Sequence, residues 1–244
     1  MEIKGNRIRV TFENKGNFAI PEEYHYEFRN VILKKIQEHD PFLSAEMHDK
    51  WNKFFSFSGF LGKQWHTPLG LAFKRVEVVF VSPDASVIYA IKNAFLLSPT
   101  FNLFDAKIIV SSVKPVNLVL NDGIMNLTYE TLGEIVIKKG EKSGKTLHVG
   151  IEDNIEEHLK NTIQNQYSSF SGLHKDLSLK VIGSKQKKKA IIKNGTISNS
   201  FIALRIRFTL KAESEIHLFL LTQGVGHHRK LGFGVVEISR EVTS

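Results

Sequence analysis

The chain has 244 residues, 42% of them hydrophobic, so it can bury a core and is not a disordered polycation. Its formal charge of +8 favours an anionic partner such as nucleic acid, because each neutralised phosphate releases counterions. The absence of cysteine excludes disulfides, thiolate zinc sites and cysteine nucleophiles. The N-terminus is too charged for a signal peptide and no apolar run is long enough for a membrane helix, so we expect a soluble, cytoplasmic protein.

The first predicted elements are a strand and a helix. Residues 8–12 alternate apolar and polar side chains, which predicts a half-buried strand. Pro21 begins a helical segment with Leu33 on one side. The apolar stripe on the opposite side consists of Tyr24, Phe28, Val31, Ile32 and Ile36. The position of Leu33 off this stripe is consistent with a position facing a cleft, and we expect a loop containing Pro41 to follow the helix.

The next elements complete one structural unit. Residues 54–58, 76–81 and 107–113 predict three strands. Ser82 and Pro83 predict the start of a helix, with serine as the cap and proline at the first helical position; Ser98-Pro99 predicts its end. The order β-α-β-β-α-β is typical of a ferredoxin-like sandwich, in which two helices cover one face of a four-stranded antiparallel sheet.

The second half repeats this order of elements. Residues 132–138 predict a strand, and apolar residues at i+4 spacing from Ile155 to Tyr167 predict a helix that ends near Gly172. The remaining elements are predicted at residues 177–182 (strand), 201–210 (strand, with alternate residues from Phe201 on one face), 212–222 (helix) and 235–238 (strand). With a boundary at the polar segment Asn121-Asp122-Gly123, the sequence predicts two tandem ferredoxin-like domains, residues 1–120 and 121–244.

A basic, glycine-rich segment, GVGHHRKLGFG, precedes the last strand. It consists of Gly224, Gly226, Gly232 and Gly234 around His227, His228, Arg229 and Lys230. Glycines allow backbone N–H groups to approach a phosphate and the cations supply charge, so we expect this loop to hold an RNA backbone. Nucleotide-binding loops are excluded, because no helix follows the segment and no Gly-Lys-Ser/Thr ends it. A tight turn with a solvated basic tip is the remaining alternative.

A second basic segment lies between two predicted strands of the second half. Its members are Lys185, Lys187, Lys188, Lys189 and, further on, Lys193. As the tip of a hairpin it is either solvated or in contact with phosphates. Two basic loops in one small domain favour nucleic acid as the partner.

The glycine-rich loop, its position and the two-sandwich layout together resemble the CRISPR-associated repeat-RNA endoribonucleases, the sixth Cas family of the RAMP superfamily. Members end with a G-h-G-x-x-x-x-x-G-h-G loop and a terminal strand, which GVGHHRKLGFG followed by VVEI matches at every glycine. Their first half carries a proline-led helix, a histidine, a lysine and an aromatic-Ser/Thr-aromatic-Ser strand. These correspond here to Pro21, His48, Lys53 and Phe55-Ser56-Phe57-Ser58.

The resemblance implies a metal-independent ribonuclease, without a cofactor, that cuts precursor CRISPR RNA within each repeat. The 2′-OH attacks the adjacent phosphate and leaves a 2′,3′-cyclic phosphate and a 5′-OH. By position, His48 is the candidate general acid or base and Lys53 the candidate phosphate-stabilising cation. A histidine with its ordinary pKa of about 6.5 suits proton transfer, and lysine suits charge stabilisation.

Other histidines are weaker candidates. His25 lies on the first predicted helix, and His227 and His228 lie in the glycine-rich loop. Neighbouring side chains of an extended loop point apart and no carboxylate lies at ligand spacing, so we expect no metal site.

One departure from the family pattern keeps a second function open. Some members place a catalytic tyrosine in the first helix, where this chain has Leu33. The alternative is therefore a non-catalytic, RNA-binding RAMP subunit. A generic protein of two RNA-recognition motifs is disfavoured, because their signature is absent and Phe55 and Phe57 are expected in the core. The expected partner is CRISPR repeat RNA; homodimer formation and membership of a CRISPR interference complex stay open.

Overall fold

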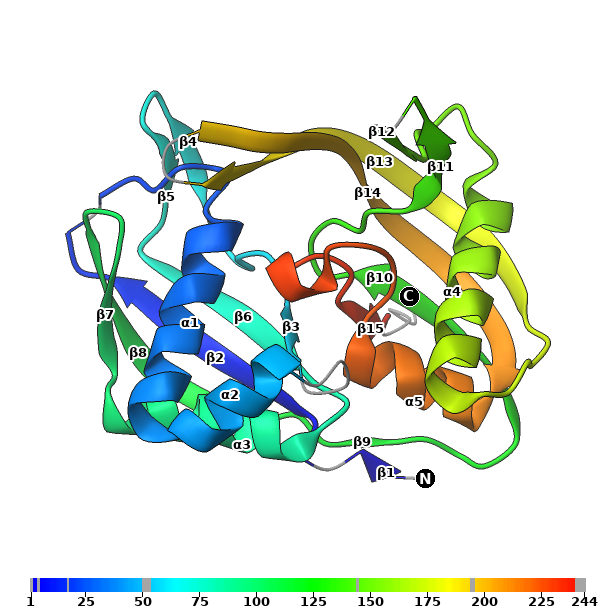
Figure 1. Cartoon of the computed structure of the whole chain (residues 1–244), viewed down its shortest axis with the longest axis horizontal. Helices are drawn as coiled ribbons and strands as arrows, with labels where there is room; N and C mark the ends of the chain where they lie inside the picture. The colour runs from blue at the N-terminus through cyan, green and yellow to red at the C-terminus, as the bar shows by residue number, and fades with distance from the viewer. Residues whose placement is uncertain are drawn as a thin grey trace, which may run out of the picture.

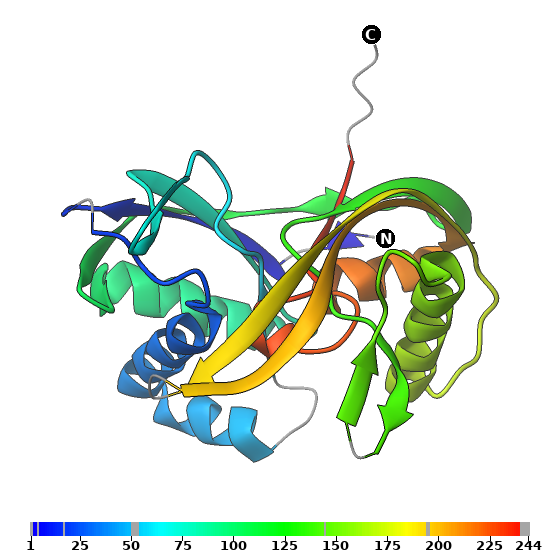
Figure 2. The ribbon, with the colours of Figure 1, turned by 90° about the horizontal axis from the view of Figure 1, so that it is seen from above.

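The computed structural model describes residues 2–3, 5–16, 18–49, 54–143, 145–193 and 196–239. It shows two sheets side by side, one from each half of the chain (Figure 1). Seen from above, the helices of both halves lie on the same side of the sheets (Figure 2). The two halves therefore lie next to each other, with their helix layers on the same side of the molecule.

The first sheet has the strand order β3-β6-β2-β8-β7. Its strands are β2 (Arg7–Asn14), β3 (Ser56–Phe57), β6 (Arg75–Val81), β7 (Thr100–Leu103) and β8 (Ala106–Pro115), with helices α1 (His25–His39) and α3 (Ala85–Leu97) packed on one face. The first strand lies between the third and the fourth, which confirms the predicted ferredoxin-like order. β7 adds a fifth strand at the edge, as a hairpin with β8.

Residues 41–49 form a helix, α2 (Pro41–Asp49), where the sequence predicted a loop. Pro41 suits the first turn, because the first N–H groups of a helix have no intrahelical partner. The N–H of Leu43 donates to Oδ1 of Asp40 at 2.9 Å. Leu43 and Met47, at i and i+4, bury the apolar face of this short helix. So short a stripe is weaker evidence for a helix than the stripe of α1.

The start of α3 also differs from its prediction. Its N-cap is Asp84, whose Oδ1 accepts from the N–H of Ser86 at 2.8 Å, so the predicted serine cap is wrong. The hydroxyl of Ser82 instead donates to the carbonyl of Phe54 at 2.6 Å and accepts from the N–H of Asp84 at 3.1 Å. Ser82 therefore ties the start of α3 to the chain entering β3. The predicted end at Ser98 is confirmed.

Two pairs of short strands lie outside the first sheet. β4 (Trp65–Thr67) and β5 (Gly70–Ala72) form a hairpin, and β1 (Glu2–Ile3) pairs with β9 (Leu118–Val119). Among the described residues, no helix is long and apolar enough to cross a membrane.

The second sheet has the order β13-β14-β10-β15. Its elements are β10 (Ile124–Thr131), α4 (Ile155–Ser171), β13 (Ser178–Lys193), β14 (Thr196–Glu213), α5 (Ser214–Gln223) and β15 (Val236–Ile238). This is the same ferredoxin-like order as in the first half. The predicted helix α4 is capped by Asn154, whose side chain accepts from the N–H of Glu157, and ends at Gly172, which has a left-handed φ of 72°.

The first strand of this half is β10, and the predicted strand at residues 132–138 is wrong. Most side chains of β10 are partly or fully exposed, so its apolar alternation is weak. The segment after β10 instead makes isolated bridges, Ile135 with Leu204 and Val136 with His227. A second hairpin that the sequence did not predict, β11 (Lys138–Lys142) with β12 (Lys145–His148), follows it.

β13 and β14 are much longer than predicted, and the lysine-rich segment lies within β13 rather than between strands. In the ladder, Lys185 pairs with Arg205 and Lys189 pairs with Phe201. Residues 183–188 of β13 are exposed, so their sequence lacks the alternation by which strands are predicted. The two strands form a long arm, drawn in yellow and orange, that crosses from the second domain to α1 of the first (Figures 1 and 2).

Each domain has its own hydrophobic core, and a third cluster joins them. The third cluster contains Val136, Ile191, Phe201, Ala203 and Phe233, with Tyr26 of α1 and Leu231 packed against it. The core of the second domain takes the other side chains of β14, from Leu204 to Leu210. The sequence predicted that alternate residues from Phe201 to Leu210 all face one way, and this is wrong. Phe201 and Ala203 pack in the third cluster, whereas the side chains from Leu204 onward pack in the core of the second domain. The change occurs where the arm extends beyond the part of the sheet that covers that core. Phe55 and Phe57 are buried core residues, as predicted.

Polar contacts also join the domains. The buried guanidinium of Arg7 on β2 donates from Nη1 to the carbonyl of Leu221 on α5 at 3.1 Å. The hydroxyl of Ser56 on β3 donates to the carbonyl of Phe233 at 3.2 Å. Buried hydrogen bonds of this kind have strict geometry, so they hold the two sheets in one arrangement.

Candidate nucleic-acid interface

The glycine-rich loop follows α5 and turns back along itself. All four of its glycines have left-handed φ angles, between 70° and 92°. A Cβ on Gly234 would lie 2.0 Å from the carbonyl oxygen of Val225, and one on Gly232 would lie 2.3 Å from the ring of Phe57. These positions therefore need glycine for conformation and for close packing.

The N–H groups of the four glycines donate to acceptors within the protein. Those of Gly226 and Gly234 donate to Oε1 of Gln166 at 3.1 Å and to the carbonyl of Glu134 at 3.0 Å. Those of Gly224 and Gly232 donate to carbonyls of the preceding turns. The glycines thus shape the loop, and the groups available to a ligand are the side chains at residues 227–230.

Two cations of the loop lie over the ring of Phe54. They belong to a short 3-10 helix, η1 (Arg229–Leu231). The guanidinium carbon of Arg229 is 5.1 Å from the ring centroid, and Nζ of Lys230 is 5.8 Å from it. Cations stack on aromatic faces at such distances. Burial lowers the pKa of Arg229 to about 10, so this side chain stays charged at neutral pH.

The two histidines of the loop lie beside Lys138 and β12. His227 is exposed, whereas the half-buried ring of His228 is 4.9 Å from the ring of Phe201. The ring of His148 is 5.8 Å from that of Phe201. Burial is the main cause that lowers the pKa of all three histidines. Repulsion from the neighbouring histidines lowers the pKa of His148 and His228 further, and repulsion from Lys138 and Arg229 does so for His227. Among the described residues, no group of three or more His, Asp or Glu side chains is placed to hold a metal ion.

The third candidate histidine, His25, is a packing residue. It is 6% exposed and its Nε2 has no hydrogen-bond partner. Burial, and then repulsion by Lys189, lower its pKa to about 3. A group so far from water and from its ordinary pKa is unsuited to exchange protons with a substrate near neutral pH.

The predicted catalytic residues lie at the edge of the described chain. His48 is in the last turn of α2, and its side chain is outside the described residues. Lys53 is also outside them. Phe54, the next residue, is the one under Arg229 and Lys230. The fold thus brings the glycine-rich loop against Phe54, which follows Lys53 directly in the sequence.

Leu33 is half-buried and packs against the core of the first domain. A position facing a cleft stays a prediction for this residue, because helix periodicity shows the side of a helix but not what covers that side.

The predicted lysines differ in their surroundings. Lys185, Lys187 and Lys188 are exposed on the arm, whereas Lys189 is 9% exposed and lies near His25. Lys193 is the last residue of β13, and its side chain is outside the described residues.

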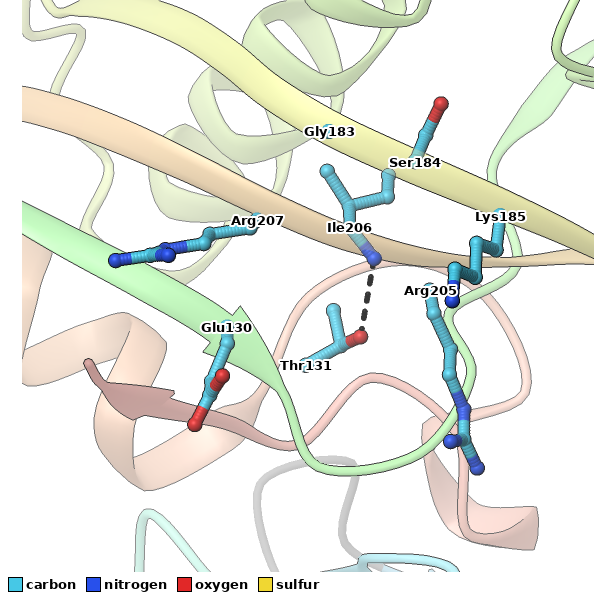
Figure 3. Close-up of a pocket in the computed structure, with 8 residues that line it drawn as sticks. All are labelled: Glu130, Thr131, Gly183, Ser184, Lys185, Arg205, Ile206 and Arg207. Carbon is cyan, nitrogen blue, oxygen red and sulfur yellow. Dashed lines mark hydrogen bonds between the residues drawn. The ribbon is translucent and has the colours of Figure 1, made fainter.

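A groove of about 420 Å³ runs along the second sheet, and sequence reasoning missed two of its cations (Figure 3). Lys185 lines it together with Arg205 and Arg207, two exposed side chains of β14. Nε of Arg205 is 3.4 Å from Oε1 of Glu134, and Glu130 also lines the groove. The signal was available, since Arg205 and Arg207 alternate with buried residues and must share one face of the strand.

Comparison with known proteins decides the family. Residues 19–114 match the model "CRISPR-associated protein Cas6, N-terminal", and residues 121–238 match "CRISPR associated protein Cas6, C-terminal". Together these matches span most of the chain. The chain belongs to the Cas6 family.

Individual relatives agree with this family. A Cas6 protein of Pyrococcus horikoshii, called the endoribonuclease-like protein Cas6nc, is 24% identical over 92% of this chain and 95% of its own length. A solved structure of a Cas6-related gene product from Pyrococcus furiosus has a TM-score of 0.81 at 22% identity, over 97% of this chain and 99% of that one. A structure titled "An RAMP protein binding different RNA substrates" has a TM-score of 0.80 at 23% identity, over 96% and 100% of the two chains.

Proposed function

We propose that this Cas6-family chain binds CRISPR repeat RNA and cleaves it by attack of a ribose 2′-OH on the adjacent phosphate. The family supports the substrate class, since one relative is endoribonuclease-like and one similar structure binds RNA. The observation that carries the proposal is the position of Arg229 and Lys230 over Phe54. A phosphate held by these cations would lie beside Phe54, the residue that follows Lys53 in the sequence.

The reaction needs two proton transfers and one stabilising charge. A base takes the proton of the 2′-OH, O2′ bonds to phosphorus, and the bond from phosphorus to O5′ breaks as an acid protonates O5′. The products are a 2′,3′-cyclic phosphate and a 5′-OH. We assign one of the proton transfers to His48 and the charge on the pentavalent phosphate to Lys53. No step needs a metal or a cofactor.

The RNA on either side of the cut would be held by cations of the second domain. The loop supplies Arg229 and Lys230, and the groove supplies Lys185, Arg205 and Arg207. Phosphate contacts of this kind position a nucleic acid without reading its sequence.

The test uses labelled repeat RNA, with and without a 2′-deoxy sugar at the scissile nucleotide, in buffer that contains EDTA. We expect cutting of the first RNA, no cutting of the second, and equal binding of both. His48→Ala should slow the cut by roughly 10²- to 10⁴-fold, the usual contribution of a general acid or base. His174→Ala, at an exposed position on the second domain, is the control. Loss of cutting in EDTA, or an unchanged rate in His48→Ala, would contradict the proposal.

A second candidate function is RNA binding without cleavage. It is favoured by Leu33, which packs on the core where some family members have a catalytic tyrosine. The same experiment separates the two functions. A non-catalytic subunit would bind both RNAs with equal affinity and would cut neither.

A further inference from the structure

The side of α1 that faces the glycine-rich loop carries an arginine that the sequence analysis did not select. The ring of His25 stacks on that of Phe233, with centroids 4.8 Å apart, and Tyr26 packs against the cluster that contains Phe233. Arg29 follows Tyr26 by three residues, so the two lie on the same side of the helix. Arg29 is half-buried at this junction between the domains.

Three cations converge where α1 meets η1. Burial lowers the pKa of Arg29. The pKa of Lys230 is also lowered, first by burial, then by repulsion from Arg29 and from Arg229. Within the part of the chain that the structure describes, no carboxylate pairs with any of the three. Like charges brought together without a counter-charge destabilise the fold, and a bound anion would remove that cost.

We propose that Arg29, Arg229 and Lys230 form one binding site for an RNA backbone phosphate, built from both domains. The inference rests on the proposed function, since the ligand is a phosphate of the bound RNA. An arginine presents a planar fork that fits phosphate oxygens in pairs, and a lysine adds a point charge. The ring of Phe54 packs under the two loop cations. The third cation, Arg29, comes from α1.

The loop that carries Arg229 and Lys230 is fixed to the first domain. The Phe233 ring under His25 and the Ser56 bond to the Phe233 carbonyl fix η1 relative to α1. A phosphate between Arg29 and Lys230 would then meet donors that are already in place, which reduces the ordering cost of binding. A phosphate at this site would also bring the RNA next to Phe54, the residue that follows Lys53.

The test measures the affinity of the full chain for a repeat RNA with a 2′-deoxy scissile sugar, across a series of salt concentrations. Arg29→Gln should weaken binding roughly tenfold at low salt, as loss of a charged hydrogen bond predicts. It should also flatten the slope of log affinity against log salt by about 0.7, the value for one phosphate on a single strand. Arg29→Lys keeps the charge and should keep the slope. Lys34→Gln, at an exposed position on the other side of α1, is the matched control.

The outcomes separate the inference from the proposed function. If the wild type does not bind repeat RNA, the proposed function fails and the inference with it. If the wild type binds and Arg29→Gln has the same slope as Lys34→Gln, only the phosphate site is refuted. The unfolding temperature of Arg29→Gln should equal or exceed that of the wild type, because the variant removes one of the repelling charges. If it is lower, Arg29→Lys decides, because a purely structural arginine would not be replaced by lysine with the slope retained.

Discussion

The imidazole of His25 stacks on the phenyl ring of Phe233, with centroids 4.8 Å apart and planes inclined by 18°. His25 begins α1 in the first domain, and Phe233 lies between the last two glycines of the loop in the second. A neutral ring at this position joins the two domains. A charged ring would have no partner for Nε2.

This contact predicts acid sensitivity. The pKa of His25 is about 3 in the folded protein and about 6.5 in the unfolded chain, so below pH 6.5 only the unfolded chain takes up this proton. The contribution of neutral His25 to the free energy of unfolding is complete above pH 6.5. It falls as the pH is lowered towards 3, by up to about 1.4 kcal/mol per pH unit. In His25→Phe, which keeps the stacking without the titration, the free energy of unfolding should fall less steeply. Urea unfolding from pH 7.5 to 4.5 measures both slopes, and parallel slopes would contradict the assignment.

The loop glycines predict a difference between two alanine variants. Gly234 (φ 91°) and Gly123 (φ 94°) both have left-handed angles, so each alanine incurs backbone strain of about 1–2 kcal/mol. A Cβ on Gly123 meets nothing within 4 Å, whereas one on Gly234 meets the carbonyl of Val225 at 2.0 Å. In Gly234→Ala the loop would have to move and lose its internal hydrogen bonds. This variant should therefore lower the free energy of unfolding by at least about 2 kcal/mol more than Gly123→Ala does. Equal unfolding midpoints in urea would show that the loop is not closely packed.

Leu33 gives a prediction on activity. Leu33→Tyr restores the residue that some family members use, so we expect RNA affinity to stay the same and the cleavage rate to rise. Leu33→Phe is the matched control, because it adds the ring without the hydroxyl. Single-turnover cleavage separates the effects. A large fall in rate with both variants would mean that Leu33 acts only through its packing on the first core.

The groove gives a prediction on binding. The double variant Arg205→Gln/Arg207→Gln should weaken RNA binding at low salt and flatten the salt slope by about 1.4, which is about 0.7 for each of two phosphates. Lys63→Gln/Lys74→Gln removes two exposed charges from the first domain and is the control. Equal slopes for the two double variants would exclude the groove from the path of the RNA. Cleavage of the bound RNA should change less than its affinity, because these residues are assigned to phosphate contacts and not to the proton transfers or to the charge on the pentavalent phosphate.

Some predictions from the sequence were correct because their signals are local. The stripe from Phe28 to Ile36 and the stripe and end of α4 depend on residues three to five positions apart, and they were found. The ferredoxin-like order follows from the sequence of such elements. Signals that are not local were missed. β10 exposes most of its side chains, the lysines at 185–188 are exposed on the arm of β13, and α2 buries only one short stripe.

By itself, the sequence determined two ferredoxin-like units, a basic glycine-rich loop and the family resemblance, because helix stripes, helix ends and glycine spacing are properties of neighbouring residues. Only the tertiary structure decided that this loop lies between Phe54 and α1, that its glycine N–H groups bond within the protein, and that Arg29 approaches Lys230. The contacts of the loop with Phe54 and with α1 join residues about 175–200 positions apart. They depend on the docking of two domains through a shared apolar cluster, and no periodicity along one chain segment encodes that docking.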